Sequence, residues 1–418
     1  MRILMIAPGF LPYTFSENLC NGKLALALQE QGHQICVISR RDEGVTYDST
    51  WETPWNTLQA RTHEVTYPVG NRVERSWDFL QSVVKIRYPF EGVRWAARAI
   101  DTGKVLLKNE KFDCIISRSP NDIVHIVGYQ LARYSRLPWI ANWNDPASPI
   151  WPEPYCIKYS LFRKNALNFY TKFLLKHADC NTFPSDSLRL HFLKNYPFLS
   201  KRYCAVIPHI GLAQAHLPPT PKPGSQDMVM RLCHAGNLSA ERNPETLFLA
   251  LARFNARFPG RIHLDILGHR TSECDRLQKK YALDELIGYP GSFPYLRALE
   301  KMAQYDILVL LEARMETGIF FASKIVDYVQ LNKPILAISP VRGFAADYLG
   351  KNGVYTVDNN SADAIEKSLE ELYQHFCNRT LAQKFDTETL QREFAPETVV
   401  QCVEKIVTNL QQKHKLIS

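Results

Sequence analysis

Two doubly wound α/β domains are the fold class that the sequence predicts, and three observations lead to it. Short apolar runs alternate with stretches of helical spacing, first over residues 3–207 and again over residues 230–338. The chain has 418 residues, which is more than one hydrophobic core usually serves. Between the two series, residues 217–225 have the sequence LPPTPKPGS, which is typical of a stiff linker. We therefore expect Rossmann-like domains over residues 1–216 and 217–395.

The first series consists of short apolar strands with helices between them. Its expected strands are 3–6, 35–39, 113–117, 139–143, 178–183 and 205–207. Its expected helices are 19–31 and 124–134. Buried strands that alternate with helices are typical of a parallel sheet with helices on both faces.

The second series follows the same pattern. Its expected strands are 230–234, 262–267, 307–311 and 335–338, and its expected helices are 244–258 and 323–330. Residues 396–412 have the spacing of one amphipathic helix.

The composition is that of an ordinary soluble protein, with 45% hydrophobic and 22% charged residues. No stretch reaches the roughly 18 apolar residues of a spanning helix. The apolar N-terminal run is broken by Pro8, Gly9 and Pro12, and this favours a buried strand over a signal peptide. Ten scattered cysteines form no zinc-type spacing and suggest reduced buried thiols. We expect a cytoplasmic protein, with peripheral contact on the inner face of the membrane as an option.

The formal net charge is +8, which suits an anionic membrane surface or anionic substrates. Nucleic acid is the weakest option, because no nucleic-acid motif occurs. Residues 87–107 and 158–176 mix basic with aromatic and aliphatic side chains. Each is either a core-facing helix with a solvated basic face or a helix on a membrane surface.

Two loops that leave strands and open helices carry the most informative residues, because ligands of such sheets bind at the carboxyl ends of the strands. In HAGNLSAERNP, Gly236 lets the backbone approach a phosphate and Arg242 adds charge, although a plain turn with an exposed Arg is the alternative. In the second loop, Gly318 precedes Lys324, whose place in the first helical turn is tolerated best beside a bound anion. Asp327 could accept hydrogen bonds from a ribose, or it could simply suit the helix N-terminus.

The first strand leads to further polar residues. Ser16, Glu17 and Asn18 lie where a helix starts, so they are either capping residues or ligand contacts. Asp145 is either a turn former before Pro146 or a contact to a hydroxyl of a ligand. A DxD segment would indicate a metal site, and the sequence contains none.

These segments, in their order, resemble the GT-B glycosyltransferases, specifically the retaining family 4. The resemblance rests on MRILMIAPGF, LALALQEQGHQICVIS, FDCIIS, LPWIANWNDP, HADCNTFPSDSLR, AVIPHIG, LCHAGNLSAERNPETLFLAL, DILVLL and SKIVDYVQLNKPILAI. It implies donor binding by the C-terminal domain and acceptor binding by the N-terminal domain. It also implies that the last helix, 396–418, packs back on the first domain, and that a nucleotide sugar is the co-substrate without cofactor or metal.

The site residues carry over only in part. The family has a basic pair for the diphosphate, and here Gly236 is kept, Asn237 stands at the first basic position and Arg242 replaces the Lys. The second of two family glutamates corresponds to Asp327, whereas the first falls at Ile319, so that Glu316 is the best substitute.

The family has a histidine after the strand that corresponds to FDCIIS, and its position corresponds approximately to Arg118 here. His125 is close in sequence and is expected on the next helix. We therefore expect Glu316, Arg242, Lys324 and Arg118 as catalytic residues. We expect Gly236, Asn237, Arg242, Gly318, Lys324, Asp327 and Ser16 as donor contacts, and Glu17, Asn18, His125 and Asp145 as acceptor contacts.

The expected function is retaining, metal-independent hexosyl transfer from a nucleotide-diphosphate sugar to a glycan or lipid-linked glycan of a cell-surface polysaccharide. Another nucleotide-sugar enzyme of this fold, an epimerase or a hydrolase, is an alternative. A non-catalytic scaffold subunit is a second one, which the departures at Ile319 and Arg118 favour.

Overall fold

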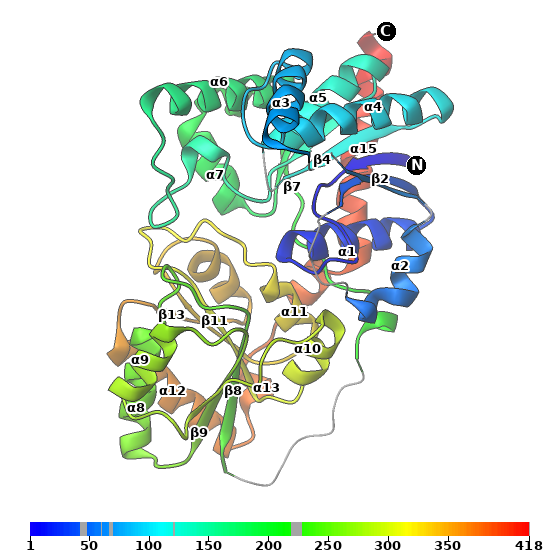
Figure 1. Ribbon diagram of the computed structural model, residues 1–418. Coiled ribbons are helices and arrows are strands. Elements are labelled where there is room, and N and C mark those ends of the chain that lie inside the picture. Colours follow the sequence, from blue (N-terminus) through cyan, green and yellow to red (C-terminus); the bar gives the residue numbers. More distant parts are fainter. Residues whose placement is uncertain (42–47, 60, 67–69, 120–121, 219–227, 418) are drawn as a thin grey trace. The chain divides into compact units, whose positions relative to one another are not determined.

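The computed structural model describes residues 1–41, 48–59, 61–66, 70–119, 122–218 and 228–417. The chain divides into two compact units (Figure 1). The first unit comprises Met1–Trp151, Cys156–Ile210 and Pro396–Ser418, and the second comprises Pro152–Tyr155 and Gly211–Ala395. The division falls after Ile210, six residues before the expected boundary, and most of the linker-like stretch lies outside the described residues.

The described part of the first unit forms a seven-stranded parallel sheet in the order β3-β2-β1-β4-β5-β6-β7. Its strands are β1 (Arg2–Ile6), β2 (Gln34–Arg40), β3 (Thr62–Val65), β4 (Cys114–Arg118), β5 (Trp139–Asn142), β6 (Cys180–Phe183) and β7 (Cys204–Val206). The order reverses between β1 and β4, and ligands bind at such a switch point, outside the carboxyl ends of the strands.

Helices cover this sheet. They are α1 (Ser16–Glu30), α2 (Glu52–Gln59), α3 (Arg72–Ile86), α4 (Val93–Asn109), α5 (Ile123–Ser135), α6 (Leu161–His177), α7 (Asp186–Asn195) and α15 (Pro396–Ile417). The last of them, α15, packs on α1. Helix α1 begins three residues earlier than the helical spacing predicts, so Ser16, Glu17 and Asn18 form its first turn.

The second unit repeats the plan with a six-stranded parallel sheet in the order β10-β9-β8-β11-β12-β13. Its strands are β8 (Met230–Ala235), β9 (Ile262–Leu267), β10 (Ile287–Gly288), β11 (Ile307–Leu311), β12 (Ile335–Ser339) and β13 (Tyr355–Asp358). Its helices are α8 (Glu245–Arg257), α9 (Ser272–Lys280), α10 (Tyr295–Met302), α11 (Lys324–Gln330), α12 (Ala362–Cys377), α13 (Leu381–Lys384) and α14 (Glu388–Glu393).

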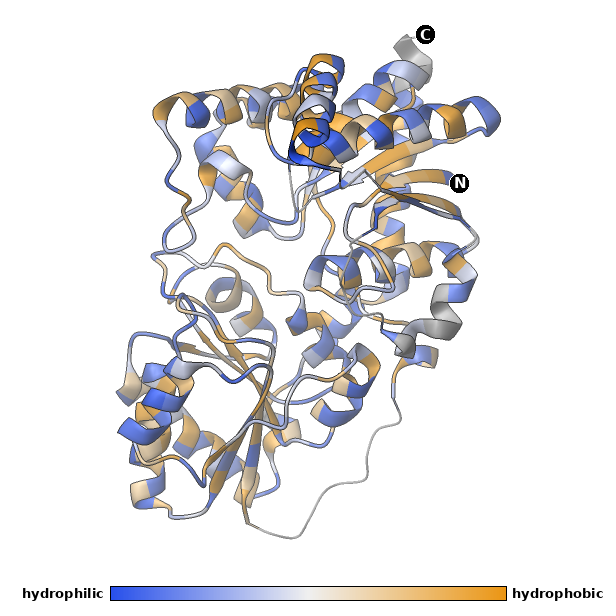
Figure 2. Cartoon of the chain, in the orientation of Figure 1, coloured by the Kyte–Doolittle hydropathy of each residue, from blue (hydrophilic) through white to orange (hydrophobic). Residues whose placement is uncertain are grey.

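The expected doubly wound α/β class is confirmed in both units. Hydrophobic residues follow the central strands, as Figure 2 shows for β8 and β11, and each of the five residues of β11 is buried. In the second unit the strand order reverses between β8 and β11. The loops that follow these two strands are therefore the expected ligand-binding loops of this unit. Among the described residues, no helix has the length and apolar character needed to cross a membrane.

Candidate functional site

The end of β8 and the start of α11 are joined by Lys324. Its Nζ donates to the carbonyl oxygen of Ala235 at 2.5 Å. Gly236 follows with φ of 117°, and a Cβ built there would lie 2.6 Å from this Nζ. Glycine is needed here for its backbone conformation and also for the space that the ammonium occupies. The predicted donor contacts Gly236 and Lys324 thus lie together.

Asn237 connects the loop after β8 to the loop after β9 by a hydrogen bond. Its Oδ1 accepts a hydrogen bond from the backbone N–H of His269 at 2.8 Å, so the loop after β8 is tied to the loop after β9. Gly268 permits this approach, because a Cβ there would lie 2.5 Å from the carbonyl oxygen of Gly236. The exposed Asn237 therefore has a clear structural role, whereas its expected donor contact stays a prediction.

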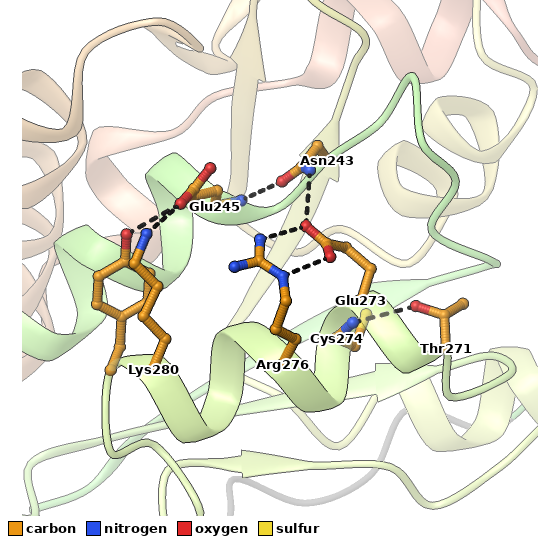
Figure 3. A network of polar contacts seen from close by, with 8 residues as sticks. Asn243, Glu245, Thr271, Glu273, Cys274, Arg276 and Lys280 are labelled. Atoms are coloured by element: carbon orange, nitrogen blue, oxygen red, sulfur yellow. Dashed lines mark hydrogen bonds and ion pairs between the residues drawn. The ribbon is translucent and has the colours of Figure 1, made fainter.

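The loop that carries Arg242 is anchored by a polar network at the start of α8 (Figure 3). Asn243 accepts from the backbone N–H of Glu245 at 2.9 Å and donates to Glu273 at 3.2 Å. Two bonds of 2.7 and 2.8 Å from Arg276 hold Glu273, while Lys280 donates to Glu245 at 2.7 Å. Helices α8 and α9 thereby fix the residue that follows Arg242.

Lys324 and Arg242 form a cationic pair beside one buried carboxyl group. Burial and the charge of Arg242 lower the pKa of Lys324 to about 7. Burial raises the pKa of Glu312 to about 7, although Arg242 and Lys324 both act to lower it. The buried Oε2 of Glu312 has no hydrogen-bond partner in the described part of the chain. Lys324 and Glu312 therefore change protonation near neutral pH, and the charge of Arg242 acts on both.

The acid beside this pair is Glu312, at the end of β11, and not the expected Glu316. Glu316 lies four residues further along the loop and is exposed, while Ile319 is buried. Gly318 lies beside Glu312, since a Cβ built on this glycine would lie 3.4 Å from Oε2 of Glu312. The catalytic role expected for Glu316 stays a prediction, but the geometry favours Glu312.

Gly318 itself is part of a backbone clasp. Its N–H donates to the carbonyl oxygen of Arg342 at 2.9 Å, and its carbonyl oxygen accepts from the N–H of Phe344 at 2.8 Å. Gly343, between these partners, has φ of 111°, which favours glycine. The clasp fixes the loop between β11 and α11.

Asp327 lies on α11 with only 7% of its surface exposed. Its Oδ1 accepts from the hydroxyl of Tyr295 and from Nε2 of Gln330, the latter at 3.3 Å. A ribose would have to share this carboxylate with those partners, so the structure gives Asp327 a role in holding α10 to α11. Its contact to a ribose remains an expectation.

Tyr155 is a member of this cluster that sequence reasoning missed. It belongs to the short segment Pro152–Tyr155 of the second unit. A hydrogen bond with the side chain of Arg242 acts to lower the pKa of Tyr155, although burial has the larger, opposite effect. Its ring packs edge-on against Phe320, with centroids 5.3 Å apart. No motif marks this residue, because it comes from a loop about ninety residues earlier in the chain than Arg242.

The first unit holds a second polar cluster, at the carboxyl ends of β1 and β4. Asn18 donates to the carbonyl oxygen of Phe10 at 2.9 Å and Asn21 to that of Gly9 at 2.8 Å. The buried Nε of Arg118 donates to Oδ1 of Asn21. Asn18 and Arg118 therefore stabilise the loop between β1 and α1, while the exposed Ser16 begins the helix.

Glu17 is the titratable centre of that cluster. It accepts from Nδ2 of Asn144 at 2.8 Å. Burial raises its pKa well above the usual range, Asp145 acts in the same direction, and His209 opposes them. Burial also lowers the pKa of His209 to about 4. Glu17 and Asp145, both expected acceptor contacts, are therefore near neighbours in the structure.

The position of His125 corrects one expectation. Its side chain is completely buried, its Nδ1 lies 2.9 Å from the hydroxyl of Ser117, and its ring lies 4.0 Å from that of Trp143. Burial lowers its pKa to about 3. A residue enclosed in this way is a core residue and does not contact an acceptor at the surface.

No group of three or more His, Cys, Asp or Glu side chains suited to a metal ion occurs within the described ranges. The cations of the second unit could instead neutralise a diphosphate, because Arg and Lys form strong charge-assisted hydrogen bonds with phosphate oxygens. That the protein needs neither a cofactor nor a metal stays a prediction.

Comparisons with known proteins agree with this architecture. The glycosyl transferase 4-like domain family matches residues 20–208, most of the first unit. No curated protein sequence matches the chain significantly.

Three solved structures share the fold over nearly their whole length. Sucrose-phosphate synthase from Thermosynechococcus elongatus is 14% identical with a TM-score of 0.66, covering 100% of this chain and 98% of its own. HepE of Anabaena, in complex with UDP and glucose, is 14% identical with a TM-score of 0.68, covering 97% and 99%. The lipopolysaccharide outer core galactosyltransferase WaaB is 12% identical with a TM-score of 0.58, covering 98% and 99%.

The expected resemblance is thereby confirmed, in the fold of both units and in the family match of the first. Residues 20–208 match the glycosyl transferase 4-like domain family, and the chain as a whole has the GT-B fold of these solved structures.

Proposed function

We propose that the chain transfers a sugar from a nucleotide-diphosphate sugar to an acceptor with retention of anomeric configuration. The acceptor we propose is a glycan or lipid-linked glycan of a cell-surface polysaccharide. The observation that carries the donor half is the cluster of Lys324, Arg242 and Glu312 at the carboxyl ends of β8 and β11. Binding of UDP and glucose by HepE, which shares the fold, agrees with it.

The proposed chemistry is electrostatic. When the sugar–phosphate bond breaks, negative charge grows on the leaving diphosphate, and two preorganised cations stabilise it without reorganising. Lys324 and Arg242 supply these cations, so the proposed reaction needs no metal. The acceptor oxygen attacks from the face that the diphosphate leaves, and the leaving phosphate takes its proton. Glu312 takes the acidic role beside the sugar for which the sequence favours Glu316.

Titration with UDP, GDP and ADP tests the donor half. Lys324→Met and Arg242→Ala should each weaken binding of the preferred nucleotide about tenfold or more, because a hydrogen bond to a charged group contributes about 1.5–3 kcal/mol. Arg257→Ala is the matched control, because this exposed side chain pairs with Glu370 on the helical side of the same unit. Unchanged affinity in both test variants would place the diphosphate elsewhere and overturn the proposal.

The alternatives separate in one further measurement. An epimerase or hydrolase consumes nucleotide sugar in the absence of an acceptor, and a scaffold subunit consumes none under any condition. A glycosyltransferase of the proposed kind should release nucleoside diphosphate at a rate that rises strongly when acceptor is added.

Glu17 and Asp145 are the side chains of the first unit that we propose as contacts to the hydroxyl groups of the acceptor.

We also propose that the first unit contacts an anionic bilayer through α3 and α6. On α3, Val73, Trp77, Leu80 and Val84 form one stripe, and each is more than half exposed. On α6, Leu161, Phe162 and Phe169 are exposed beside Lys164 and Lys172, and the exposed Lys158 lies three residues before this helix. Apolar side chains flanked by basic ones suit a membrane surface with acidic lipids.

Sedimentation with lipid vesicles tests this contact. The protein should pellet with vesicles of phosphatidylcholine and phosphatidylglycerol, and Trp77→Ser with Phe162→Ser should release it. Val341→Ser is the control, because Val341 is equally exposed but belongs to the second unit. Failure of the unchanged protein to bind acidic vesicles would refute the contact.

A further inference from the structure

A cavity of the first unit has a lining that shares no residue with the cluster around Glu17. It has a volume of about 430 Å³, and its lining combines cationic, acidic and aromatic side chains. The lining includes Arg40, Arg75, Phe79, Tyr88, Glu91, Arg94, Trp95, Asp122, Tyr159 and Arg163. Ligand sites in proteins commonly have this size and are apolar with a few convergent polar groups.

The cations of the cavity outnumber its acids by four to two. Arg94 is paired with Asp78, and Arg163 with Glu91 at 2.6 Å. The exposed guanidinium of Arg75, on α3, has no hydrogen bond or ion pair with another described residue. A cavity with excess positive charge and an uncommitted guanidinium is suited to phosphate, which arginine binds with two parallel hydrogen bonds.

Other lining residues offer groups for hydroxyls. Tyr88 is 97% buried, since only 3% of its surface is exposed, and its hydroxyl has no hydrogen-bond partner in the described structure. Asp122 is buried nearby, where it accepts from the N–H of Ser148 at 3.3 Å and from the hydroxyl of Thr171, also at 3.3 Å. Burial raises the pKa of Asp122 to about 6, so the repulsion of an anion by this carboxylate is lost only below that pH. Because Tyr88 lines the cavity and its hydroxyl has no partner in the described part of the chain, that hydroxyl is available to a ligand.

Helix α3 relates this cavity to the proposed membrane contact. Arg75 and Phe79 line the cavity, and Ser82 and Ile86 continue their stripe as buried residues. The exposed stripe of Val73 and Trp77 is offset by two positions, a rotation of about 200° around a helix of 3.6 residues per turn. One side of α3 therefore lines the cavity, and the other side is exposed to solvent.

We propose that this cavity binds the phosphate or diphosphate group of the acceptor, with the arginines on the phosphate and Tyr88 on an adjoining hydroxyl. This inference rests on the proposed glycosyl transfer and adds the chemical class of the acceptor, a phosphate ester. The ester is either carried by a lipid or free as a sugar phosphate, and both share the chemistry that the cavity recognises.

Calorimetry on the full chain without donor tests the inference. The probes are farnesyl diphosphate, its uncharged analogue farnesol, and glucose 1-phosphate. At least one phosphate ester should bind, and Arg75→Ala and Arg40→Ala should weaken it about tenfold, as loss of a charge-assisted hydrogen bond predicts. Tyr88→Phe keeps the ring and should weaken binding several-fold. Arg72→Ala is the control, since Arg72 is exposed on the same helix but does not line the cavity.

The outcomes distinguish a lipid-linked from a soluble phosphate ester, and they distinguish failure of this inference from failure of the proposed donor site. Tighter binding of farnesyl diphosphate supports a lipid-linked acceptor, and tighter binding of glucose 1-phosphate supports a soluble one. Equal binding of farnesol and farnesyl diphosphate, no binding of either ester, or unchanged affinity in Arg75→Ala would each overturn the inference. Nucleotide affinity that still depends on Lys324 and Arg242 would show that the proposed donor site survives such a failure.

Discussion

Two groups with a pKa near 7 face the proposed diphosphate site, and the consequence is a dependence of binding on pH. A bound diphosphate favours the charged ammonium of Lys324 and the uncharged carboxyl of Glu312. Both groups are protonated below pH 7, because the pKa of Lys324 is lowered to about 7 and that of Glu312 is raised to about 7. Each loses its proton as the pH rises through 7, and each loss opposes the anion.

We therefore predict that nucleoside diphosphate binds more weakly as the pH rises from 6 to 8.5, by up to about tenfold per pH unit for each linked proton. Calorimetry in two buffers with different ionisation enthalpies should detect proton uptake on binding at pH 7.5. Lys324→Met cannot titrate and should flatten the dependence. Ionisation of the nucleotide phosphate contributes equally to the pH dependence of affinity in Lys324→Met and in the unchanged protein. If affinity changed with pH to the same extent in both proteins, Lys324 would not be the titrating group and the assignment would be wrong.

The choice between two acids on one loop gives a second prediction. Glu312 is held beside Lys324 and Arg242, whereas Glu316 is exposed. Glu312→Gln should lower the turnover number at least tenfold with little change in the Michaelis constant for donor, because an interaction made in the transition state affects turnover. Glu316→Gln is the matched comparison and should retain most activity. The reverse pattern would restore Glu316 to the catalytic role.

The limits of sequence reasoning are clear at these residues. The cationic positions Lys324 and Arg242 follow from loops at strand ends, which the hydrophobic pattern locates well. The choice of Glu312 depends on how the Gly318–Gly343 clasp folds the loop, and spacing alone does not contain that information. Tyr155 comes from a distant loop that carries no motif. His125 is adjacent to a family position in sequence, but it faces the core.

Among the elements, the network at the start of α8 positions Arg242, and we predict that its loss loosens the donor loop. Asn243→Ala removes the acceptor for the N–H of Glu245 and the donor to Glu273. Loss of hydrogen bonds of this kind costs about 1 kcal/mol, which corresponds to roughly 2–4 °C in the melting temperature of a unit of this size. Nucleotide affinity should fall with it.

Lys280→Ala is the control for this network. It removes an exposed ion pair with Glu245, and such pairs contribute little to stability. Scanning calorimetry and nucleotide titration on both variants give the comparison. An Asn243→Ala protein with unchanged melting temperature and unchanged affinity would show that the network does not position the loop.

Elements with uniform burial could be predicted, and elements with mixed burial could not. The strands β1 and β11 are nearly all apolar, so their sequence predicts them directly. Strand β13 is only half-buried along its length, and β10 has two residues, so neither gives a clear pattern. Helix α3 has one stripe toward the cavity and another toward solvent, and this hides the single apolar face that an amphipathic helix usually shows.

At the scale of the whole molecule, the two units are built from unequal parts of the chain. The second unit is almost continuous, whereas the first takes its last helix from the C-terminal end of the chain. On α15, Val399, Val403 and Leu410 are buried, and Glu404 pairs with His33 at 2.9 Å. The first unit is therefore complete only when the entire chain has been synthesised.

We predict from this arrangement that a cavity in α15 destabilises the first unit alone. Leu410→Ala should cost about 2–5 kcal/mol, as large-to-small changes in a core do, while Gln412→Ala, at an exposed position on the same helix, should cost little. Thermal unfolding with and without nucleoside diphosphate assigns the transitions. Nucleotide at a hundred times its dissociation constant should stabilise the second unit by about 2.7 kcal/mol. Leu410→Ala should lower the other transition and leave the nucleotide-sensitive one in place. If the protein showed a single unfolding transition, and both Leu410→Ala and added nucleotide shifted it, the two units would unfold together.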